Sequence, residues 1–390
     1  MGKIIVMNLG STSFKYKLFN EKLEALSTGC VESVGAAQSA YDLRIGEKAI
    51  SGALLCPTHE DAFALCLNFL MESGALSSIA ELDAVGYKAV HCGAVSDAQK
   101  VDDALLDKME RFNSFAPAHN PVYIRMMRAM RERYPQLKQA ACFETAFHAT
   151  IPLERAVYGV PFEWVEKYGI RRYGFHGSSH GYMAHRIKEM EPGARRVISI
   201  HLGGSSSVCA IEDGRSVANS MGCTPQSGLF QNNRVGDLDV FCLQELADKE
   251  GGLEAVMKTL SSKSGLLGIS GISNDMRKVM EAAEQGDKRA MLAIDAFTDN
   301  IVGYIGMYTA YLNGLDVLVF TGGIGKNSAT IRRMVCGRLS WLRLKLDETK
   351  NESVWEGKLS REESRVKVYA LETNEEWMVV RATMQCWGLG

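Results

Sequence analysis

Residues 4–19 of the chain read IIVMNLGSTSFKYKLF. An apolar run leads into Asn8, Leu9 and Gly10, three hydroxyl residues follow, and a second apolar run then begins. Apolar and β-branched runs of this length favour strands, and glycine with small polar residues favours a turn. The stretch therefore predicts two strands joined by a turn. Small residues there let a ligand approach the backbone, and successive N–H groups with hydroxyls favour an anion.

The same pattern returns in the second half of the chain, where residues 197–211 read VISIHLGGSSSVCAI. Asn8 aligns with His201 and Gly10 with Gly203, at a constant offset of 193 positions (201 minus 8). We interpret this as an internal repeat of one strand–turn–strand unit. Two such hairpins, one per domain, could hold the phosphates of a nucleotide. A glycine–serine hairpin without a ligand is the alternative for a single copy, and the duplication argues against it.

The composition of the chain limits the classes of protein and of ligand that can be expected. The 390 residues are 46% hydrophobic, which is ordinary for a globular chain that can form two cores. The net charge is -2, from 44 basic and 46 acidic residues, so it favours neither nucleic acid nor an anionic membrane as a partner. Small molecules are the expected ligands. Ten cysteines without metal-finger spacing suit reduced core thiols in a cytoplasmic protein. No apolar run approaches the roughly 18 residues of a membrane span, and no secretory signal is expected.

Strand-like and helix-like runs alternate along the chain, which is typical of an α/β fold. Strands are expected at 3–7, 14–19, 84–90 and 317–320, and helices at 61–71, 121–133, 290–311 and 375–381. A third glycine-rich turn, LVFTGGIGKNS at 318–328, leads from a strand into a helix, a common place for nucleotide contacts. A tight strand–helix turn without a ligand would use the same residues. The GK[ST] ending of a Walker loop is absent, which disfavours P-loop kinases.

Nine motifs together resemble the acetate/propionate kinase family. They are NLGSTSFK (8–15), APAHNP (116–121), FETAFH (143–148), RYGFHGSSH (172–180), HLGGSSS (201–207), RVGDLD (234–239), SNDMR (273–277), TGGIGKNS (321–328) and TNEE (373–376). They run in order from residue 8 to residue 376, so the resemblance covers nearly the whole chain. The family belongs to the actin-like phosphotransferase superfamily, whose duplicated domains agree with the repeat.

The resemblance implies an α/β fold made of duplicated actin-like (ribonuclease H-like) ATPase domains with an interdomain cleft. It places an N-terminal domain at 1–148 plus 374–390 and a nucleotide-binding domain at 149–373. The implied activity is the reversible, ATP-dependent and Mg2+-requiring phosphorylation of a short-chain carboxylate, such as acetate or propionate, to an acyl phosphate. A homodimer is implied as well.

The resemblance also assigns roles to individual residues. Glu144, His176 and Arg234 match catalytic positions. The positions that match nucleotide contacts are His201, Leu202, Gly203, Gly204, Ser205, Asp275, Met276, Arg277, Gly323, Ile324, Gly325, Lys326 and Asn327. The phosphate motif comprises Ser11, Ser13, Lys15 and His180, and the metal ligands are Asn8 and Glu375. The substrate-binding positions are Lys88, Val90, Ala118, His119, Phe175 and Pro225.

The chemistry makes these assignments reasonable. Phosphoryl transfer needs in-line positioning and neutralisation of charge on the phosphoryl oxygens, and a guanidinium such as Arg234 suits that task. A carboxylate such as Glu375 can hold magnesium. The acceptor carboxylate is already ionised at neutral pH, so no strong base is required.

Individual residues of this set also have explanations that involve no function. Arg234 could be a surface loop residue, and Glu375 could only begin a helix. His176 and His180 are four apart and hint at a metal site. The segment HGSSH, however, lacks the glutamate of HExxH and has a poor helix-forming interior, so zinc is disfavoured.

The chain departs from the family pattern near the acceptor. Lys88 stands where the family has the arginine that clamps the substrate carboxylate, and Glu144 stands in place of an aspartate. QNNR at 231–234 replaces MGTR, and Lys326 replaces a glutamate. Ala118 replaces a leucine and should widen the acyl pocket for a larger or more polar acid.

Two alternatives remain open at this stage. One is a nucleotide-binding regulatory homologue in which Lys88 and Glu144 abolish transfer. The other is a kinase of the same superfamily that acts on a hydroxyl group, with Glu144 as the base.

Overall fold

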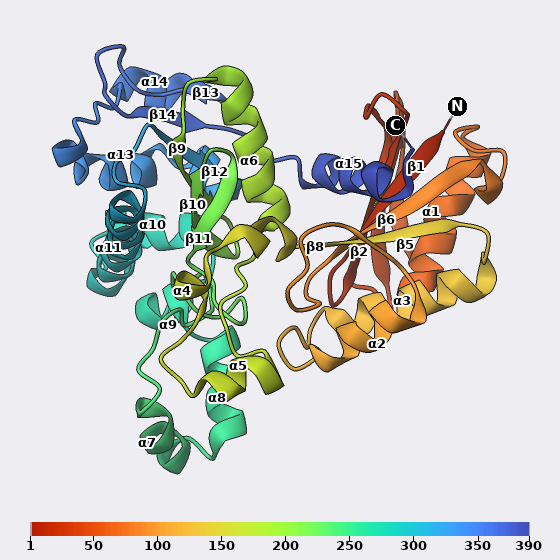
Figure 1. Cartoon of the computed structure of the whole chain (residues 1–390), viewed down its shortest axis with the longest axis horizontal. Helices are drawn as coiled ribbons and strands as arrows, with labels where there is room; N and C mark the ends of the chain where they lie inside the picture. The colour runs from red at the N-terminus through yellow and green to blue at the C-terminus, as the bar shows by residue number, and fades with distance from the viewer. Residues whose placement is uncertain (1, 390) are drawn as a thin grey trace. The chain divides into compact units, whose positions relative to one another are not determined.

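A computed structural model describes residues 2–389 of the chain (Figure 1). Within these residues the chain forms two compact units. Unit 1 comprises the residues up to Ala149 together with those from Asn374 onward, and unit 2 comprises Thr150–Thr373. The C-terminal segment therefore returns to the unit that contains the N-terminus.

Unit 1 is built on one eight-stranded sheet in the order β5-β4-β3-β2-β1-β6-β8-β7. The strands are β1 (Lys3–Leu9), β2 (Ser13–Phe19), β3 (Ala25–Glu32), β4 (Ser39–Ile45), β5 (Lys48–Leu54), β6 (Leu82–Ala89), β7 (Gln99–Lys100) and β8 (Lys138–Phe143). The strands from β1 to β5 form an antiparallel meander. β6 pairs in parallel with both β1 and β8.

Both faces of strand β1 are covered, because successive side chains of a strand point to opposite sides. Ile5, Met7 and Leu9 belong to the core formed with α1 (His59–Glu72), α2 (Asp103–Arg111) and α3 (Asn120–Arg133). Ile4 and Val6 pack instead with the C-terminal helix α15 (Glu375–Trp387). This two-sided burial explains why the first apolar run is continuous rather than alternating.

Unit 2 is built on a six-stranded sheet in the order β11-β10-β9-β12-β14-β13. The strands are β9 (Arg196–Leu202), β10 (Ser206–Glu212), β11 (Arg215–Asn219), β12 (Val317–Thr321), β13 (Gly357–Lys358) and β14 (Lys367–Ala370). The helices are α4 (Leu153–Ala156), α5 (Phe162–Tyr168), α6 (Gly177–Met190), α7 (Cys242–Lys249), α8 (Leu253–Ser262), α9 (Gly265–Ser270), α10 (Met276–Glu284), α11 (Lys288–Tyr311), α12 (Gly322–Asn327), α13 (Ala329–Gly337) and α14 (Glu348–Ser353).

The two sheets share one five-stranded pattern. In unit 1 the order is β3-β2-β1-β6-β8, and in unit 2 it is β11-β10-β9-β12-β14, with the same sequence of antiparallel and parallel pairings. β1 and β9 begin at residues 3 and 196, and β2 and β10 begin at residues 13 and 206. Both differences are 193 positions, the offset found in the sequence. The internal repeat is therefore confirmed.

Strand β9 separates an apolar side from a polar side within unit 2. Ile198, Ile200 and Leu202 lie in the core formed largely with α11 and α13. The intervening residues Ser199 and His201 form hydrogen bonds to side chains of helix α6. The alternation thus places polar side chains beside the hairpin turn that the sequence singled out.

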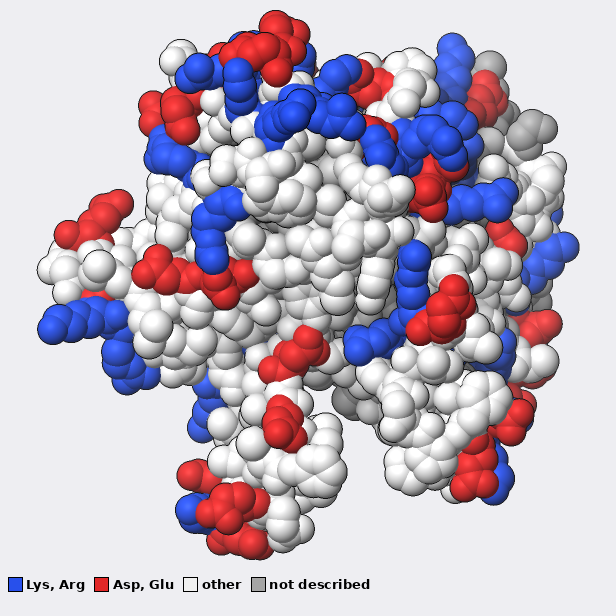
Figure 2. Space-filling model, turned by 60° about the vertical axis from the view of Figure 1, so that its left-hand side comes forward, with Lys and Arg blue, Asp and Glu red and all other residues white. Residues whose placement is uncertain are grey.

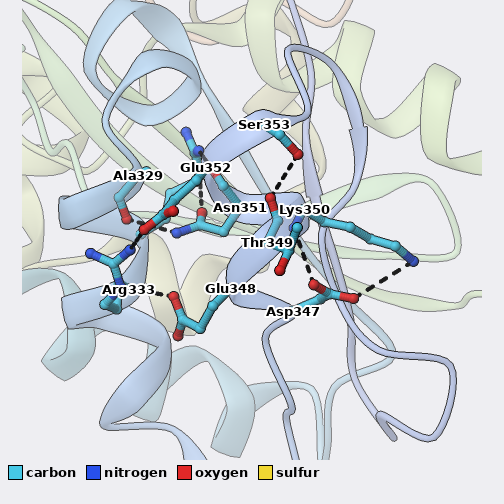
Figure 3. Close-up of polar contacts among 10 residues, drawn as sticks. Ala329, Arg333, Asp347, Glu348, Thr349, Lys350, Asn351, Glu352 and Ser353 are labelled. Atoms are coloured by element: carbon cyan, nitrogen blue, oxygen red, sulfur yellow. Dashed lines mark hydrogen bonds and ion pairs between the residues drawn. The ribbon is translucent and has the colours of Figure 1, made fainter.

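Helix α14 braces helix α13, which follows the third glycine-rich turn. Arg333 forms ion pairs with Glu348 at 2.8 Å and with Glu352 at 2.6 Å (Figure 3). The side-chain amide of Asn351 donates to the carbonyl of Ala329 at 3.0 Å. These contacts fix the first turn of α13 and with it the end of the glycine-rich segment.

Two sequence expectations need correction. The segment HGSSH was expected to be a poor helix former, but helix α6 begins at Gly177 and contains His180. Gly177 and the two serines occupy the first turn, whose backbone N–H groups have no partner within the helix in any case, and the side chains of Ser179 and His180 form hydrogen bonds to β9. The cysteines were expected in the core. Six of them are buried, but Cys242 is exposed on α7.

The charge of the surface and the apolar character of the helices are relevant to possible partners. Figure 2 shows one face of the molecule, on which Lys and Arg side chains are interspersed with Asp and Glu side chains. Among residues 2–389, no helix has the length and apolar character needed to cross a membrane.

Candidate active site

A pocket of about 760 Å3 lies in unit 2 beside two of the glycine-rich turns. Its lining comes from the β9–β10 turn, from α10 and the residues before it, and from α12. The lining residues are Gly203, Gly204, Asn232, Asn274, Asp275, Met276, Arg277, Met280, Glu281, Glu284, Gly323, Ile324, Asn327 and Ser328. The volume lies within the range of roughly 300–1,000 Å3 that is usual for small-molecule sites.

The lining suits a nucleotide. A side chain added at Gly204 or at Gly323 would meet nothing within 4 Å, so both turns expose backbone to open space. Exposed backbone N–H groups at glycine turns can bind phosphate. Met276, Met280 and Ile324 supply apolar surface that a base could cover.

The first turn of α10 gives the pocket a charged wall. The carboxylate of Asp275 caps the helix by accepting from the backbone N–H of Arg277 at 3.0 Å. The guanidinium of Arg277 donates to both carboxylate oxygens, at 3.0 and 2.7 Å. These hydrogen bonds lower the pKa of Asp275 to about 2, so this carboxylate is ionised at neutral pH.

Several residues expected at the nucleotide do not line the pocket. His201, Leu202, Ser205, Gly325 and Lys326 lie outside its lining. Lys326 is buried, and its ammonium forms an ion pair with Glu372 and lies 3.7 Å from the ring centroid of Trp355.

Gly322 is a position where the turn between β12 and α12 requires glycine. Its φ is +77°, and an added Cβ would lie 2.6 Å from the carbonyl oxygen of Leu202. Glycine therefore lets α12 start directly against the end of β9.

We expect Gly322→Ala to lower the free energy of unfolding by at least about 1–2 kcal/mol, the cost of a left-handed backbone for a side-chain-bearing residue. Gly323→Ala is the matched control, because its Cβ has open space and its φ is not in the left-handed region. Urea unfolding of the two variants measures the difference. Equal stability of the two variants would contradict this account of the turn.

Three histidines of unit 2 form a network with three serines. His176 Nδ1 and His180 Nε2 both lie 2.8 Å from Ser207 Oγ. His180 Nδ1 lies 2.9 Å from Ser199 Oγ, and Ser179 Oγ lies 2.8 Å from His201 Nδ1. The rings of His176 and His201 stack with centroids 4.3 Å apart. The structure thus brings together His176, His180 and His201, which the sequence placed in three different roles.

Arg234 lies in the loop before α7 and is tied to a wall of the predicted acyl pocket. Its Nη1 donates to the carbonyl of Pro225 at 3.4 Å and to the hydroxyl of Ser205 at 3.2 Å. Burial lowers the pKa of Arg234, but arginine is the most basic side chain and is effectively always protonated in proteins, so the guanidinium stays charged.

In unit 1 the side chains of Lys88, Glu144 and Glu375 meet. The ammonium of Lys88 forms an ion pair with Glu375, and it lies 3.8 Å from a carboxylate oxygen of Glu144. Lys88 lies on β6, Glu144 follows β8, and Glu375 begins α15. Burial acts to lower the pKa of Lys88, but the carboxylates of Glu375 and Glu144 outweigh it and raise that pKa above its ordinary value.

Three of the four residues predicted for the phosphate motif, Ser11, Ser13 and Lys15, lie on the β1–β2 hairpin, whereas His180 lies on α6 of unit 2. Asn8 pairs with Lys15 across the hairpin, and the backbone N–H of Gly10 donates to the carbonyl of Ser13 at 2.9 Å. Ser11 is exposed at the turn. The ammonium of Lys15 lies 3.8 Å from the carboxylate of Glu32.

Tyr123 of α3 is a residue that the sequence reasoning missed. Its hydroxyl accepts from the backbone N–H of Leu9 at 2.8 Å, and its ring is fully enclosed in the core. It also interacts electrostatically with Lys88 and Glu144. Tyr123 therefore connects the hairpin to the Lys88 cluster. The one sequence signal was a tyrosine on an apolar helix face, whose hydroxyl needs a partner.

The remaining substrate positions are divided between the two units. Val90 follows β6, and Ala118 and His119 precede α3, with His119 at its N-cap. Ala118 is exposed. Phe175 is buried in unit 2, where its carbonyl accepts from the side-chain amide of Asn219 at 3.2 Å.

A duplicated sheet with hairpin turns at equivalent positions, and a glycine-lined pocket in the second copy, define an actin-like phosphotransferase. Comparison with known proteins gives the family. The model of the acetokinase family matches residues 3–381, and the chain belongs to that family.

Similar proteins span nearly the whole chain. A propionate kinase of Citrobacter rodentium is 40% identical over 98% of this chain and 96% of that protein. An acetate kinase of Shouchella clausii is 39% identical over 99% of both chains. The crystal structure of the acetate kinase of Porphyromonas gingivalis has a TM-score of 0.91 at 35% identity, covering 99% of this chain and all of that one.

Proposed function

We propose that this chain transfers the γ-phosphoryl group of ATP to a short-chain carboxylate and forms an acyl phosphate and ADP, reversibly. Full-length similarity to proteins named acetate kinase and propionate kinase is the observation that carries the proposal. A carboxylate oxygen forms a bond to the γ-phosphorus while the bond from that phosphorus to the bridging oxygen of ADP breaks. No proton is transferred, because the acceptor is already an anion.

The nucleotide is assigned to the pocket of unit 2. Backbone of Gly203, Gly204 and Gly323 would meet phosphates, and Met276 and Ile324 would cover the base. Further contacts are assigned to Asp275, Arg277 and Asn327. The volume of the pocket and its exposed glycine backbone support this assignment.

Stabilisation of the transferring phosphoryl group is assigned to Arg234 and His176. A guanidinium and an imidazole can donate to oxygens on which negative charge is spread in the transition state. The stacking of His176 against His201 and its bond to Ser207 support this role, because both restrict the imidazole.

Magnesium is assigned to Asn8 and Glu375, whose amide and carboxylate oxygens are the ligand types that this cation prefers. Within residues 2–389 no three His, Cys, Asp or Glu side chains gather as a metal cluster. Magnesium typically takes one or two protein carboxylates and completes its shell with water and substrate phosphates. When bound, the cation neutralises phosphate charge. Lys88 already contacts Glu375, so the ammonium and the cation would share this carboxylate.

The acceptor is assigned to Lys88 and to the apolar positions Val90, Ala118, Phe175 and Pro225, and His119 is assigned beside them. The ammonium of Lys88 lies near two protein carboxylates. The carboxylate of the acid would therefore compete with Glu144 and Glu375 for contact with this ammonium. We propose that the units are the two actin-like domains.

The proposal extends to a cytoplasmic homodimer. The ten free cysteines support a reducing compartment. Light scattering on the purified protein measures the mass in solution. A monomeric mass would contradict the proposed homodimer.

Hydroxylamine tests the type of product. We expect that ATP, Mg2+ and acetate or propionate give a hydroxamate in the presence of hydroxylamine, because the nucleophile cleaves an acyl phosphate but not a phosphate ester. A panel of larger and hydroxylated acids extends the assay to the acceptor range. Phosphorylation of a polyol without hydroxamate from any acid would contradict the proposal.

A further inference from the structure

The backbone of the loop Gln231–Arg234 is held by hydrogen bonds. The N–H of Gln231 donates to the carbonyl of Arg234 at 3.0 Å, and the carbonyl of Gln231 accepts from the N–H of Leu266 at 2.9 Å. Helix α9 begins against this loop at Gly265, whose φ is +60°. A Cβ at Gly265 would lie 2.0 Å from the carbonyl oxygen of Gln231, so only glycine allows this packing.

The side chains of Gln231 and Arg234 form hydrogen bonds to each other, to Ser205 and to the carbonyl of Pro225. Gln231 is fully buried, and its Nε2 donates to the carbonyl of Pro225 at 2.8 Å. Its Oε1 accepts from the hydroxyl of Ser205 at 2.6 Å and from Nη1 of Arg234 at 3.3 Å. Because Ser205 gives its proton to Gln231, its oxygen is free to accept from the same Nη1, at 3.2 Å.

The hydrogen bonds that Arg234 itself donates all come from one end of its guanidinium. Among residues 2–389, the side-chain hydrogen bonds of Arg234 are formed by Nη1 alone, to Ser205, Pro225 and Gln231. The edge formed by Nε and Nη2 therefore keeps its donors for a ligand. Two parallel N–H donors on such an edge match the oxygens of a phosphoryl group.

The partners of Nη1 are all neutral. A hydroxyl, an amide oxygen and a backbone carbonyl orient the guanidinium without cancelling its charge. A carboxylate in the place of the Gln231 amide would hold the arginine more strongly, but it would also neutralise the charge that phosphoryl transfer requires. A buried amide satisfied at both ends is thus suited to orienting an arginine that must act on an anion.

We infer that Gln231 and Ser205 are positioning residues that hold Nη1 of Arg234 and so present its Nε–Nη2 edge to the transferring phosphoryl group. This inference rests on the proposed function, because it needs Arg234 to act on that group.

The test compares Gln231→Met in the parent enzyme and in an Arg234→Ala background. Methionine keeps the length of the side chain and removes both polar groups. In the parent we expect kcat to fall about tenfold, since losing a hydrogen bond to a charged group is worth at least that factor, while the Kd for ATP stays within about twofold. In the Arg234→Ala background we expect no further fall, because the arginine through which Gln231 acts is gone.

A second variant, Gln231→Glu, separates positioning from packing. Glutamate preserves the size and can still accept from Nη1, and beside an arginine it is ionised. We expect a larger fall in kcat than for Gln231→Met, because the new carboxylate neutralises Arg234.

The outcomes distinguish the positioning role of Gln231 from the role of Arg234 in the proposed function. An equal fall for Gln231→Met in both backgrounds, an unchanged kcat, or a Gln231→Glu enzyme more active than Gln231→Met would overturn the inference. If instead Arg234→Ala alone retained the parent kcat, the assignment of Arg234 in the proposed function would be wrong.

Discussion

Arg234→Ala is expected to lower kcat for acyl phosphate formation by roughly 10³-fold or more, the range seen when an arginine is removed from a phosphoryl-transfer site. The guanidinium is charged, half-buried and held at one end, so no solvent cation replaces it in the same orientation. Steady-state kinetics with saturating acid and ATP measures the change.

The nucleotide affinity provides the internal control. Arg234 does not line the pocket assigned to ATP, so calorimetry should give an unchanged Kd for ATP in the same variant. Arg234→Lys should fall between the parent and alanine, because lysine keeps the charge but not the two-pronged donor edge. A large loss of ATP affinity with an unchanged kcat would contradict this role.

Glu375→Gln is expected to lower kcat at least about 100-fold and to raise the Mg2+ concentration needed for half-maximal rate. Charge stabilisation supplied by a metal is worth several kcal/mol, and about 1.4 kcal/mol is tenfold in rate. The substitution also leaves the ammonium of Lys88 with Glu144 as its remaining carboxylate partner among these three residues, at 3.8 Å. Titration of Mg2+ at fixed ATP and acid measures both effects.

Glu376→Gln is the matched control for this experiment. Glu376 stands next to Glu375 in the first turn of α15 and loses the same charge, but its carboxylate pairs with Lys17 at 3.0 Å. The account expects a rate and a Mg2+ dependence close to those of the parent. Equal effects of the two substitutions would point to the helix terminus rather than to a metal ligand.

Much of the fold could be predicted because the hairpin carries its own pattern. The apolar runs around Gly10 and Gly203 fix strand–turn–strand units, and the constant offset reveals the duplication. Helices such as α3 and α11 followed from apolar periodicity. The start of α6 was missed because propensity alone disfavours Gly177, whereas packing against β9 and the position in the first turn decide the outcome.

The site was predictable only where a motif fixes the local backbone. The glycines at 203, 204 and 323 line the pocket as their motifs suggested. The hydrogen-bond and ion-pair partners of the polar side chains could not be predicted, because those partners come from distant parts of the chain. Ser207 could as well have been a surface serine, and the pairing of Lys88 with Glu375 joins residues on β6 and α15.

If a carboxylate oxygen of the acid attacks the γ-phosphorus of ATP, that oxygen becomes the bridge of the acyl phosphate and can be followed into the phosphate. Acetate or propionate labelled with oxygen-18 is incubated with the protein, ATP and Mg2+, and the product is cleaved with hydroxylamine, which attacks the carbonyl carbon. We expect phosphorus NMR of the released phosphate to show one labelled oxygen in each phosphate ion. Unlabelled phosphate would mean that water, and not the acid, had accepted the phosphoryl group.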